Sequence, residues 1–311
     1  MLITVAICTW NRSELLKQTL EQMTKLIVPT GIQWELLVVN NNCTDSTDEV
    51  IDLHSRDLPI RRLFEAKPGK SHALNLAARE AQGEYILWTD DDALVDERWL
   101  SEYYAAFKRW PDAALFGGTV EPWFEGTPPQ WLLEVLPQVF GAYAVRDLGN
   151  HPIRLSDENG IGILPFGVNF AIRSEQQRRY LYDTRLGPKP ASSVRSEEVT
   201  LVRTMLKLGL SGWWVPTARV AHYVPANRQT ISYLRSFYFG QGEYQVVNDQ
   251  NYHGPMLFGK PRWLWKAAVQ AELKYRFHRC FHHHTVWIED LMRSSALWGN
   301  LRLSLACPHR R

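Results

Sequence analysis

The stretch Tyr85-Ile86-Leu87-Trp88-Thr89-Asp90-Asp91-Asp92 constrains the chain most, because a short apolar run leads directly into three carboxylates. An apolar run of this length is typical of a strand buried in an α/β sheet. Open α/β sheets bind their ligands at the carboxyl ends of the strands, where these acids would lie. Three adjacent negative charges repel one another unless water or a cation neutralises them. The stretch therefore predicts either an acidic turn or a site for Mg²⁺ or Mn²⁺ with a phosphorylated substrate.

Strand-like and helix-like patterns alternate in the first part of the chain. The strand patterns cover Leu2–Cys8, Trp34–Val39, Ile60–Phe64 and Tyr85–Trp88, and the helical patterns follow Ser13, cover Thr47–Leu53 and follow Lys70. We expect Ser13 to cap its helix, whose apolar positions continue to Ile27. This alternation is typical of βαβ units and indicates a largely parallel sheet.

The second part of the chain is less regular. It predicts a strand over Ala113–Val120, a loop over Pro122–Trp131, a loop entering a strand over Leu164–Arg173, a helix capped by Ser196, two short strands over 213–216 and 219–222, and helices after Ile231. The triplet His282-His283-His284 is too short and too isolated to predict a metal site.

Two nucleotide-binding motifs are absent. Gly69-Lys70-Ser71 resembles the end of a P-loop, but the glycine that this motif needs at position 64 is Phe64. No G-x-G-x-x-G follows a predicted strand, which argues against a dinucleotide oxidoreductase.

The cysteines and the apolar segments indicate the compartment. Cys8, Cys43, Cys280 and Cys307 show no C-x-x-C spacing and are typical of reduced thiols in a cytosolic protein. No apolar stretch approaches the roughly 18–20 residues that span a bilayer. The chain starts directly in a predicted strand, so we expect no signal peptide and a cytoplasmic protein.

The charge of the chain is unevenly distributed. Residues 260–311 contain ten Lys or Arg and three Asp or Glu, a net charge of +7, whereas the whole chain has a net charge of +2. The same segment contains Trp263, Trp265, Trp287 and Trp298. This composition is typical of interfacial helices at an anionic membrane surface. A helical pair that packs on the catalytic domain or on a second copy of the chain is the alternative.

At this point the ordered motifs resemble family 2 inverting glycosyltransferases of the GT-A fold. The matching segments are Thr9–Arg12, Val38–Asp45, Gly69–Asn75, Gly83–Asp92, Phe166–Arg173, Ser196–Leu201 and Val220–His222. The resemblance implies an α/β, Rossmann-like domain over residues 1–225, with a mixed, mostly parallel sheet. Residues 1–120 would form its nucleotide-binding half and 121–225 its acceptor and catalytic-base half. Residues 226–311 would form a helical C-terminal extension.

The resemblance also implies residues that bind the nucleotide-sugar donor. They are Thr9, Asn11, Arg12, Asn41, Lys70, Asn75, Asp90, Asp91 and Asn169. The chain has Val39-Asn40-Asn41 where the family usually has Val-Asp-Asp or Val-Asp-Asn, so an asparagine carbonyl would accept from a uracil N–H. An asparagine-rich turn without a ligand and an ordinary surface lysine at position 70 are the alternatives.

The metal and the catalytic base follow from the same resemblance. Asp92 and His222 would hold a divalent metal, Mn²⁺ or Mg²⁺. Glu198, the second acid of the Glu197-Glu198 pair, would take the proton of the acceptor hydroxyl. The alternative for this pair is two exposed acids that stabilise a helix N-terminus. Trp123 and Trp131 are candidates for stacking on an acceptor ring.

We therefore expect a metal-dependent enzyme that moves one sugar from a UDP- or dTDP-linked donor to a glycan or lipid-linked glycan in surface polysaccharide synthesis. The Gln-x-x-Arg-Trp signature of the polymerising synthases is absent, which favours single-sugar addition. We expect no nucleic acid partner. The competing hypotheses are a sugar-nucleotide nucleotidyltransferase and a non-catalytic scaffold that binds carbohydrate or membrane.

Overall fold

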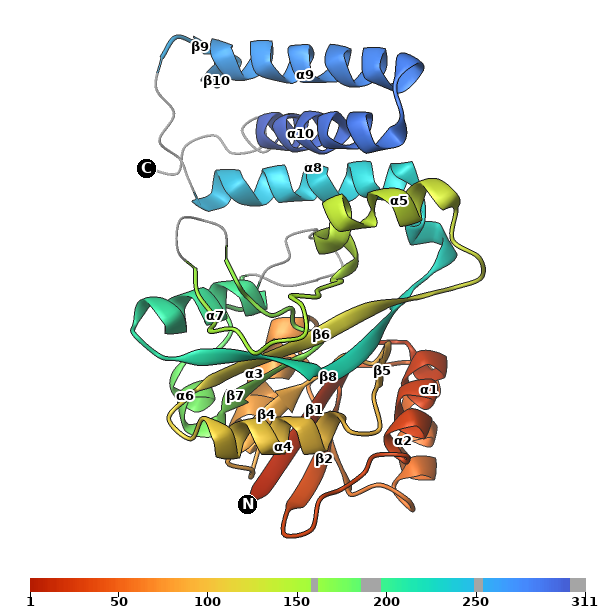
Figure 1. The fold of residues 1–311 in the computed structure, drawn as a ribbon, viewed down its shortest axis with the longest axis vertical. Helices are drawn as coiled ribbons and strands as arrows, with labels where there is room; N and C mark the ends of the chain where they lie inside the picture. The colour runs from red at the N-terminus through yellow and green to blue at the C-terminus, as the bar shows by residue number, and fades with distance from the viewer. Residues whose placement is uncertain (158–161, 186–196, 249–253, 303–311) are drawn as a thin grey trace. The chain divides into compact units, whose positions relative to one another are not determined.

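The computed structural model of the chain describes residues 1–157, 162–185, 197–248 and 254–302, with side chains except those of 244–248. Its described part contains an eight-stranded sheet of order β3-β2-β1-β4-β7-β6-β8-β5 (Figure 1). The strands are β1 (Leu2–Thr9), β2 (Gln33–Asn40), β3 (Ile60–Phe64), β4 (Tyr85–Trp88), β5 (Ala93–Val95), β6 (Leu115–Phe124), β7 (Phe170–Arg173) and β8 (Gly212–Val224). The sheet is parallel from β3 to β4, whereas β7 runs antiparallel to both β4 and β6. The predicted mixed, mostly parallel α/β sheet is therefore confirmed.

Both faces of the central strands are buried, which explains their continuous apolar sequences. In β4, Tyr85 and Leu87 belong to one hydrophobic cluster and Ile86 and Trp88 to the other. The first cluster contains side chains from α1 (Ser13–Met23), α2 (Thr47–His54) and α4 (Trp99–Arg109). The second contains side chains from α3 (Lys70–Glu80) and α7 (Glu197–Lys207). The sheet is thus covered by helices on both sides.

The structure corrects several predicted element boundaries. Helix α1 begins at Ser13 itself, whose N–H donates to the Asp45 carboxylate over 2.9 Å, and it ends at Met23. The predicted loop over Pro122–Trp131 is wrong at both ends, because β6 continues to Phe124 and α5 (Gln130–Val139) begins before Trp131. The predicted cap Ser196 lies outside the described residues.

The predicted pair of short strands at 213–222 is one strand, β8. Pro216 lies within it, although proline cannot donate a ladder hydrogen bond. Its carbonyl instead accepts from the Thr119 hydroxyl over 3.0 Å. Side-chain bonding from β6 therefore supports the strand where the sequence suggested a break.

The chain divides into two compact units. Among the described residues, the first unit takes in 1–123, 197–223 and the described parts of 144–185. The second takes in 124–143 and the described parts of 224–302. Because the second unit includes 124–143, it is discontinuous in sequence, unlike the predicted extension. The predicted domain boundary at 225 stays a prediction.

Helices dominate the second unit. They are α5, α8 (Ile231–Asn248), α9 (Arg262–Phe281), α10 (His284–Arg302) and the short 3₁₀ helices η1 (Phe140–Tyr143) and η3 (Ala226–Arg228), while β9 (Met256–Leu257) and β10 (Lys260–Pro261) form a hairpin. Helix α6 (Ser174–Arg179) belongs to the first unit. Helices α8 and α10 approach so closely that a Cβ at Gly242 would overlap the Ala296 carbonyl, and one at Gly299 the Phe239 carbonyl. None of the described helices has the length and apolar character needed to cross a bilayer.

Candidate active site

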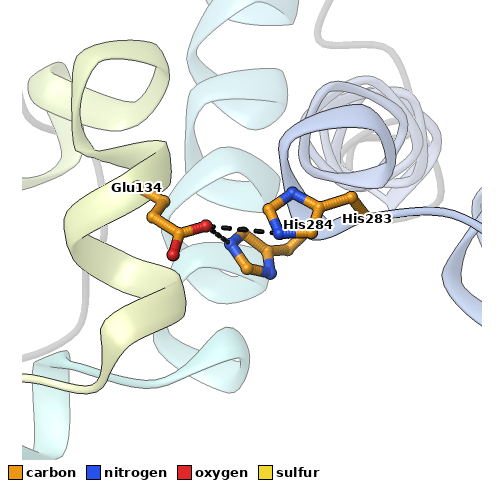
Figure 2. A group of neighbouring side chains, drawn as sticks. All are labelled: Glu134, His283 and His284. Carbon is orange, nitrogen blue, oxygen red and sulfur yellow. Dashed lines mark hydrogen bonds and ion pairs between the residues drawn. The ribbon is translucent and has the colours of Figure 1, made fainter.

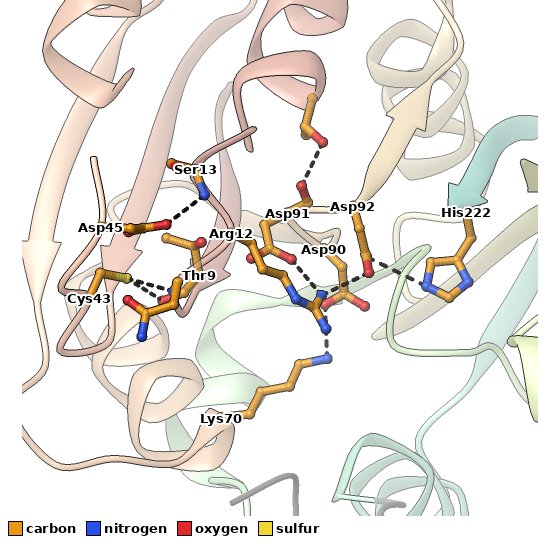
Figure 3. Close-up of polar contacts among 12 residues, drawn as sticks. Thr9, Arg12, Ser13, Cys43, Asp45, Lys70, Asp90, Asp91, Asp92 and His222 are labelled. Atoms are coloured by element: carbon orange, nitrogen blue, oxygen red, sulfur yellow. Dashed lines mark hydrogen bonds and ion pairs between the residues drawn. The ribbon is translucent and has the colours of Figure 1, made fainter. Parts of the chain in front are cut away.

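The three aspartates lie at the carboxyl end of β4, in the middle of the sheet. Asp91 and Asp92 are buried, and Asp90 is partly exposed. Figure 3 shows them surrounded by side chains from β1, α3 and β8. The acids that follow this apolar run therefore form a cluster inside the protein rather than a solvated turn.

Two cations neutralise part of this cluster. Arg12 Nη1 lies 3.0 Å from Asp91 Oδ1 and 2.8 Å from Asp92 Oδ2 (Figure 3). Lys70 Nζ lies 2.8 Å from Asp90 Oδ1. Burial alone would lower the pKa of Lys70, but the carboxylates around it raise this pKa well above its usual value. Lys70 is therefore charged at neutral pH, and its side chain is only 24% exposed.

Asp91 differs from its two neighbours in its partners. Its backbone carbonyl accepts from the Thr19 hydroxyl over 3.0 Å, which ties the triplet to α1. Burial raises the pKa of the Asp91 side chain to about 6, and the Asp92 carboxylate adds to the rise, while Arg12 opposes it. Arg12 contacts Asp91 and Asp92 alike, so the part of Asp91 in donor binding stays a prediction.

Asp90, Asp92 and His222 can together hold a metal ion. Their ligand atoms all lie within 4.8 Å of one another, and His222 Nε2 lies 3.5 Å from Asp92 Oδ1. His222 is placed there because β8 pairs antiparallel with β5, and its direct partner on β5 is Ala93, the residue after the triplet. Two carboxylates and one imidazole suit Mn²⁺ or Mg²⁺ in chemistry. The structure therefore adds Asp90 to the predicted ligands Asp92 and His222.

Glu198 joins the same network from the first turn of α7. Its Oε1 lies 3.0 Å from Lys70 Nζ, so one ammonium contacts both Asp90 and Glu198. The Glu198 side chain packs directly on Gly167, where an added Cβ would lie 2.6 Å from Glu198 Cδ. Sequence reasoning included Gly167 only within the matching segment Phe166–Arg173. The structure shows that its missing side chain makes room for the Glu198 carboxyl group.

Three predicted nucleotide-binding residues lie at or just after the ends of β1 and β2. Thr9 is buried, and its carbonyl accepts from the Asn41 N–H over 3.0 Å. Asn11 has a positive φ of 51° and is exposed, and its Oδ1 accepts from the Thr44 N–H over 2.7 Å. The Asn41 amide donates to the Glu65 and Lys67 carbonyls, and its Oδ1 accepts from the Gly69 N–H. The structure therefore uses Asn41 to hold the loop that leads into α3, and its contact with a base stays a prediction.

Asn75 and Asn169 are tied into the protein interior. Asn75 exchanges two hydrogen bonds with the Tyr182 backbone, 2.9 and 2.8 Å long. Asn169 is completely buried, and its side chain makes four hydrogen bonds of 2.8 Å. An asparagine side chain offers two N–H donors and two acceptor positions. A sugar hydroxyl would have to displace one of these four partners, and the contact of Asn169 with the donor sugar stays a prediction.

Sequence reasoning missed the function of Asp45. Its carboxylate accepts from the Ser13 N–H at the start of α1 and from the Thr47 hydroxyl, so it links two helix N-termini. Burial alone would raise the pKa of Asp45, but these hydrogen bonds lower it. Asp45 lies two residues before the predicted helix at Thr47, which is a signal that it caps that helix. No signal in the sequence indicates that it also caps α1, whose first residue, Ser13, lies 32 residues earlier in the chain.

Solved glycosyltransferase structures share this architecture. The mannosyltransferase PcManGT of Pyrobaculum calidifontis, solved with GDP-Man and Mn²⁺, matches with a TM-score of 0.60 at 19% identity, over 96% of this chain and 87% of that one. TarS 1–349 of S. aureus, solved with UDP-GlcNAc, matches with a TM-score of 0.53 at 15% identity, over 91% of this chain and 74% of that one. At these identities the likeness shows the fold alone. The chain thus has the GT-A fold of glycosyltransferases.

Sequence comparison gives the family. The profile described as "Glycosyl transferase family 2" matches residues 4–157, which contain the β1 loop, Lys70 and the aspartate triplet. Glucosyl-dolichyl phosphate glucuronosyltransferase of Haloferax volcanii is 25% identical over 264 residues, which cover 81% of this chain and 79% of that protein. The chain belongs to glycosyltransferase family 2 and is a glycosyltransferase. The nucleotidyltransferase and scaffold hypotheses are therefore set aside.

Proposed function

We propose that the chain transfers a single sugar, with inversion, from a UDP- or dTDP-linked donor to a glycan or lipid-linked glycan acceptor in surface polysaccharide synthesis. The observation that carries this proposal is the convergence of two groups of residues. Asp90, Asp92 and His222 form a metal-ligand group, and Lys70 connects this group to Glu198. In a glycosyl transfer with a diphosphate leaving group, a divalent cation can stabilise the charge on the leaving group, and a proton acceptor activates the attacking hydroxyl.

The charge balance of the site supports a divalent ion. Arg12 and Lys70 are in contact with four carboxylates, those of Asp90, Asp91, Asp92 and Glu198. The carboxylates in these contacts therefore outnumber the cations by two, which matches one Mn²⁺ or Mg²⁺. When bound, this ion would balance the negative charge of the leaving nucleoside diphosphate.

Arg12 and Lys70 are also suited to the diphosphate itself. Lys70 is the first residue of α3, where helix N–H groups attract anions. The Arg12 side chain is 40% exposed although its guanidinium contacts buried acids. Both cations can therefore exchange a carboxylate partner for a phosphate oxygen when the donor binds. In this proposal, Thr9 and Asn11 shape the loop that borders the nucleotide.

Glu198 is the proposed general base. The acceptor hydroxyl attacks the anomeric carbon, its proton passes to the Glu198 carboxylate, and the bond from the anomeric carbon to the diphosphate oxygen breaks. Lys70 holds the Glu198 carboxylate beside the donor site before the reaction. We expect Glu198→Gln to lower kcat by at least about a hundredfold, while the dissociation constant of the nucleotide stays within about threefold of its unchanged value. Normal turnover by this variant would refute the assignment.

The donor can be tested by ligand-induced thermal stabilisation. UDP, dTDP and GDP are compared with and without Mn²⁺, in the unchanged protein and in Asp92→Asn. We expect UDP or dTDP to raise the unfolding temperature only with Mn²⁺, and Asp92→Asn to remove this increase. TarS binds UDP-GlcNAc and PcManGT binds GDP-Man. A larger shift with GDP would replace the uridine or thymidine proposal, and no metal-dependent shift with any nucleotide would refute the metal-dependent mechanism.

A lipid-linked acceptor is supported by an exposed surface of α9. Val269, Leu273, Phe277 and Phe281 follow one another at four-residue spacing and are all exposed. We call these four residues the α9 stripe. The exposed cations of the same helix are Arg262, Lys266, Lys274, Arg276 and Arg279. An apolar stripe flanked by cations fits an anionic membrane surface, and the related Haloferax volcanii enzyme is named for a dolichyl phosphate acceptor. These features support our proposal that the protein acts at the inner face of the cell membrane.

The tryptophans do not form this surface as the sequence suggested. Trp287 is buried, and Trp265 and Trp298 pack against a small core with Leu264. Among the four, Trp263 is exposed. The membrane proposal thus depends on the phenylalanines and leucine of the α9 stripe.

Flotation with liposomes tests the α9 stripe. We expect Leu273→Glu with Phe277→Glu to abolish flotation with vesicles that contain anionic lipid. Leu53→Glu is the matched control, because Leu53 on α2 is 53% exposed but belongs to the other unit. Equal flotation by both variants would refute the membrane proposal. A change in sedimentation mass without a change in flotation would instead assign the stripe to a homodimer.

A further inference from the structure

A second cluster of metal-ligating side chains lies in the helical unit. Glu134 on α5 meets His283 and His284 at the start of α10 (Figure 2). His284 Nε2 lies 2.5 Å and His283 Nε2 3.3 Å from the same Glu134 oxygen, Oε2. One ligand atom from each residue lies within 4.8 Å of the others. The three residues belong to one compact unit and come from segments about 150 residues apart.

We propose that Glu134, His283 and His284 bind a transition-metal ion of the Zn²⁺ type, and that this ion fastens α5 to the start of α10. Two imidazole nitrogens and one carboxylate oxygen are a zinc ligand set that leaves a fourth position for water. Imidazole ligands favour Zn²⁺ and related ions over Mg²⁺ and Ca²⁺, which prefer oxygen. This site is independent of the glycosyl-transfer proposal, because no residue of it belongs to the first unit.

The orientation of two of the three ligands, His283 and Glu134, is supported by a neighbouring group. His283 Nδ1 lies 3.1 Å from the Thr285 hydroxyl, which can accept from Nδ1–H when Nε2 is a metal ligand. Gln130 donates to Glu134 Oε1 over 3.0 Å, which leaves Oε2 facing the imidazoles. Hydrogen bonds from Gln130 and His284 lower the pKa of Glu134, so it is a carboxylate at neutral pH. Such outer partners are characteristic of metal sites that are already formed in the protein.

The two histidines are held together rather than spread apart. Their ring centroids lie 3.7 Å apart, at an interplanar angle of 38°. Two protonated imidazoles at this distance would repel each other, whereas two neutral ones can share a cation. Next to them, the Gln138 amide of α5 donates to the Thr285 carbonyl over 3.0 Å. The two segments are therefore already aligned for a shared ion.

Metal-binding stoichiometry tests this proposal on full-length protein without an affinity tag. Zn²⁺ is titrated by calorimetry, and Co²⁺ is used as a spectroscopic probe of tetrahedral coordination. We expect His283→Ala with His284→Ala to lose one equivalent of bound Zn²⁺ and the corresponding Co²⁺ absorption. Glu134→Gln, which keeps the size of the side chain, should lower the affinity for this Zn²⁺ ion by at least about tenfold. Asp92→Asn identifies any separate equivalent bound at the aspartate cluster.

His282→Ala is the matched control. It removes the third imidazole of the triplet, which is exposed and lies outside the ligand cluster. We expect this variant to bind Zn²⁺ with unchanged stoichiometry and affinity. Equal stoichiometry in the unchanged protein and the double variant would overturn the proposal. A similar loss in His282→Ala would also overturn it, because the binding would then follow the number of histidines and not this geometry.

Discussion

Asn169 offers the sharpest test of the structure against the sequence-based expectation. The resemblance to the family suggests a residue that binds the donor sugar, whereas the structure buries Asn169 completely. These alternatives make opposite predictions for Asn169→Ala. A lost sugar contact would raise the donor KM and leave stability unchanged, and a lost core residue would lower the free energy of unfolding.

The structure allows the size of the effect to be worked out. The side chain has four hydrogen-bond partners at 2.8 Å, namely Trp99 Nε1, the Tyr103 hydroxyl and the carbonyls of Thr119 and Ala218. Asn169→Ala leaves all four without this partner in the interior. Leaving a buried polar group unpaired costs about 1–3 kcal/mol, so the low end for four groups is about 4 kcal/mol. This is a large part of the roughly 5–15 kcal/mol that stabilises a typical protein.

Stability is measured by urea unfolding, with tryptophan fluorescence as the signal. The KM for the donor is measured separately, at a temperature where the variant is folded. We expect a loss of about 4 kcal/mol or more and a nearly unchanged KM. Tyr103→Phe is a milder variant that removes one of the four bonds, and it should cost about 1 kcal/mol. Full stability of Asn169→Ala together with a strongly raised donor KM would refute the core assignment.

Two further predictions concern groups that support the active site. Gly167→Ala pushes the Glu198 carboxyl group from its position, so kcat should fall by about a hundredfold while nucleotide affinity stays unchanged. Gly141→Ala is the control, because Gly141 has open space around it, and this variant should have a normal kcat. An unchanged kcat in Gly167→Ala would contradict this packing. Hydrogen bonds lower the pKa of Asp45 in the folded protein. The ionised Asp45 therefore stabilises the protein fully at a pH above the pKa of Asp45 in the unfolded chain, and this stabilisation is lost as the pH falls through its pKa in the folded protein. Asp45→Asn should therefore lower the unfolding temperature at pH 7 more than at pH 3, and an equal loss at both values would show that its ionisation does not matter.

Much of the sheet was predictable because its signals are local. The strand at Tyr85–Trp88 has the predicted bounds, since a strand buried on both faces leaves a continuous apolar run. The strand at Ile60–Phe64 also has the predicted bounds, although it lies at the edge of the sheet and is partly exposed. The strand β8 was divided in the prediction because Pro216 is a strong local break signal. The bond from Thr119 that supports it joins residues 97 positions apart, and no local pattern encodes such a contact.

The sequence predicts which residues belong to the candidate site, but it does not predict the ion pairs between them. The triplet, Glu198 and His222 were chosen as single residues from ordered motifs. Only the structure shows that Lys70 bridges Asp90 and Glu198, and that Arg12 bridges Asp91 and Asp92. Side-chain pairing depends on how strands and helices pack, which a one-dimensional pattern does not contain.

The order of residues alone predicts an α/β sheet with acids at the end of its central strand, because a buried strand and its terminal charges are adjacent in the chain. The tertiary structure decided what three other groups of residues do. It buried Asn169, turned most of the C-terminal tryptophans inward, and brought Glu134 to His283 and His284. The physical reason is the same in each case. Burial and ligand geometry arise from contacts between distant segments, and these contacts exist only when the chain is folded.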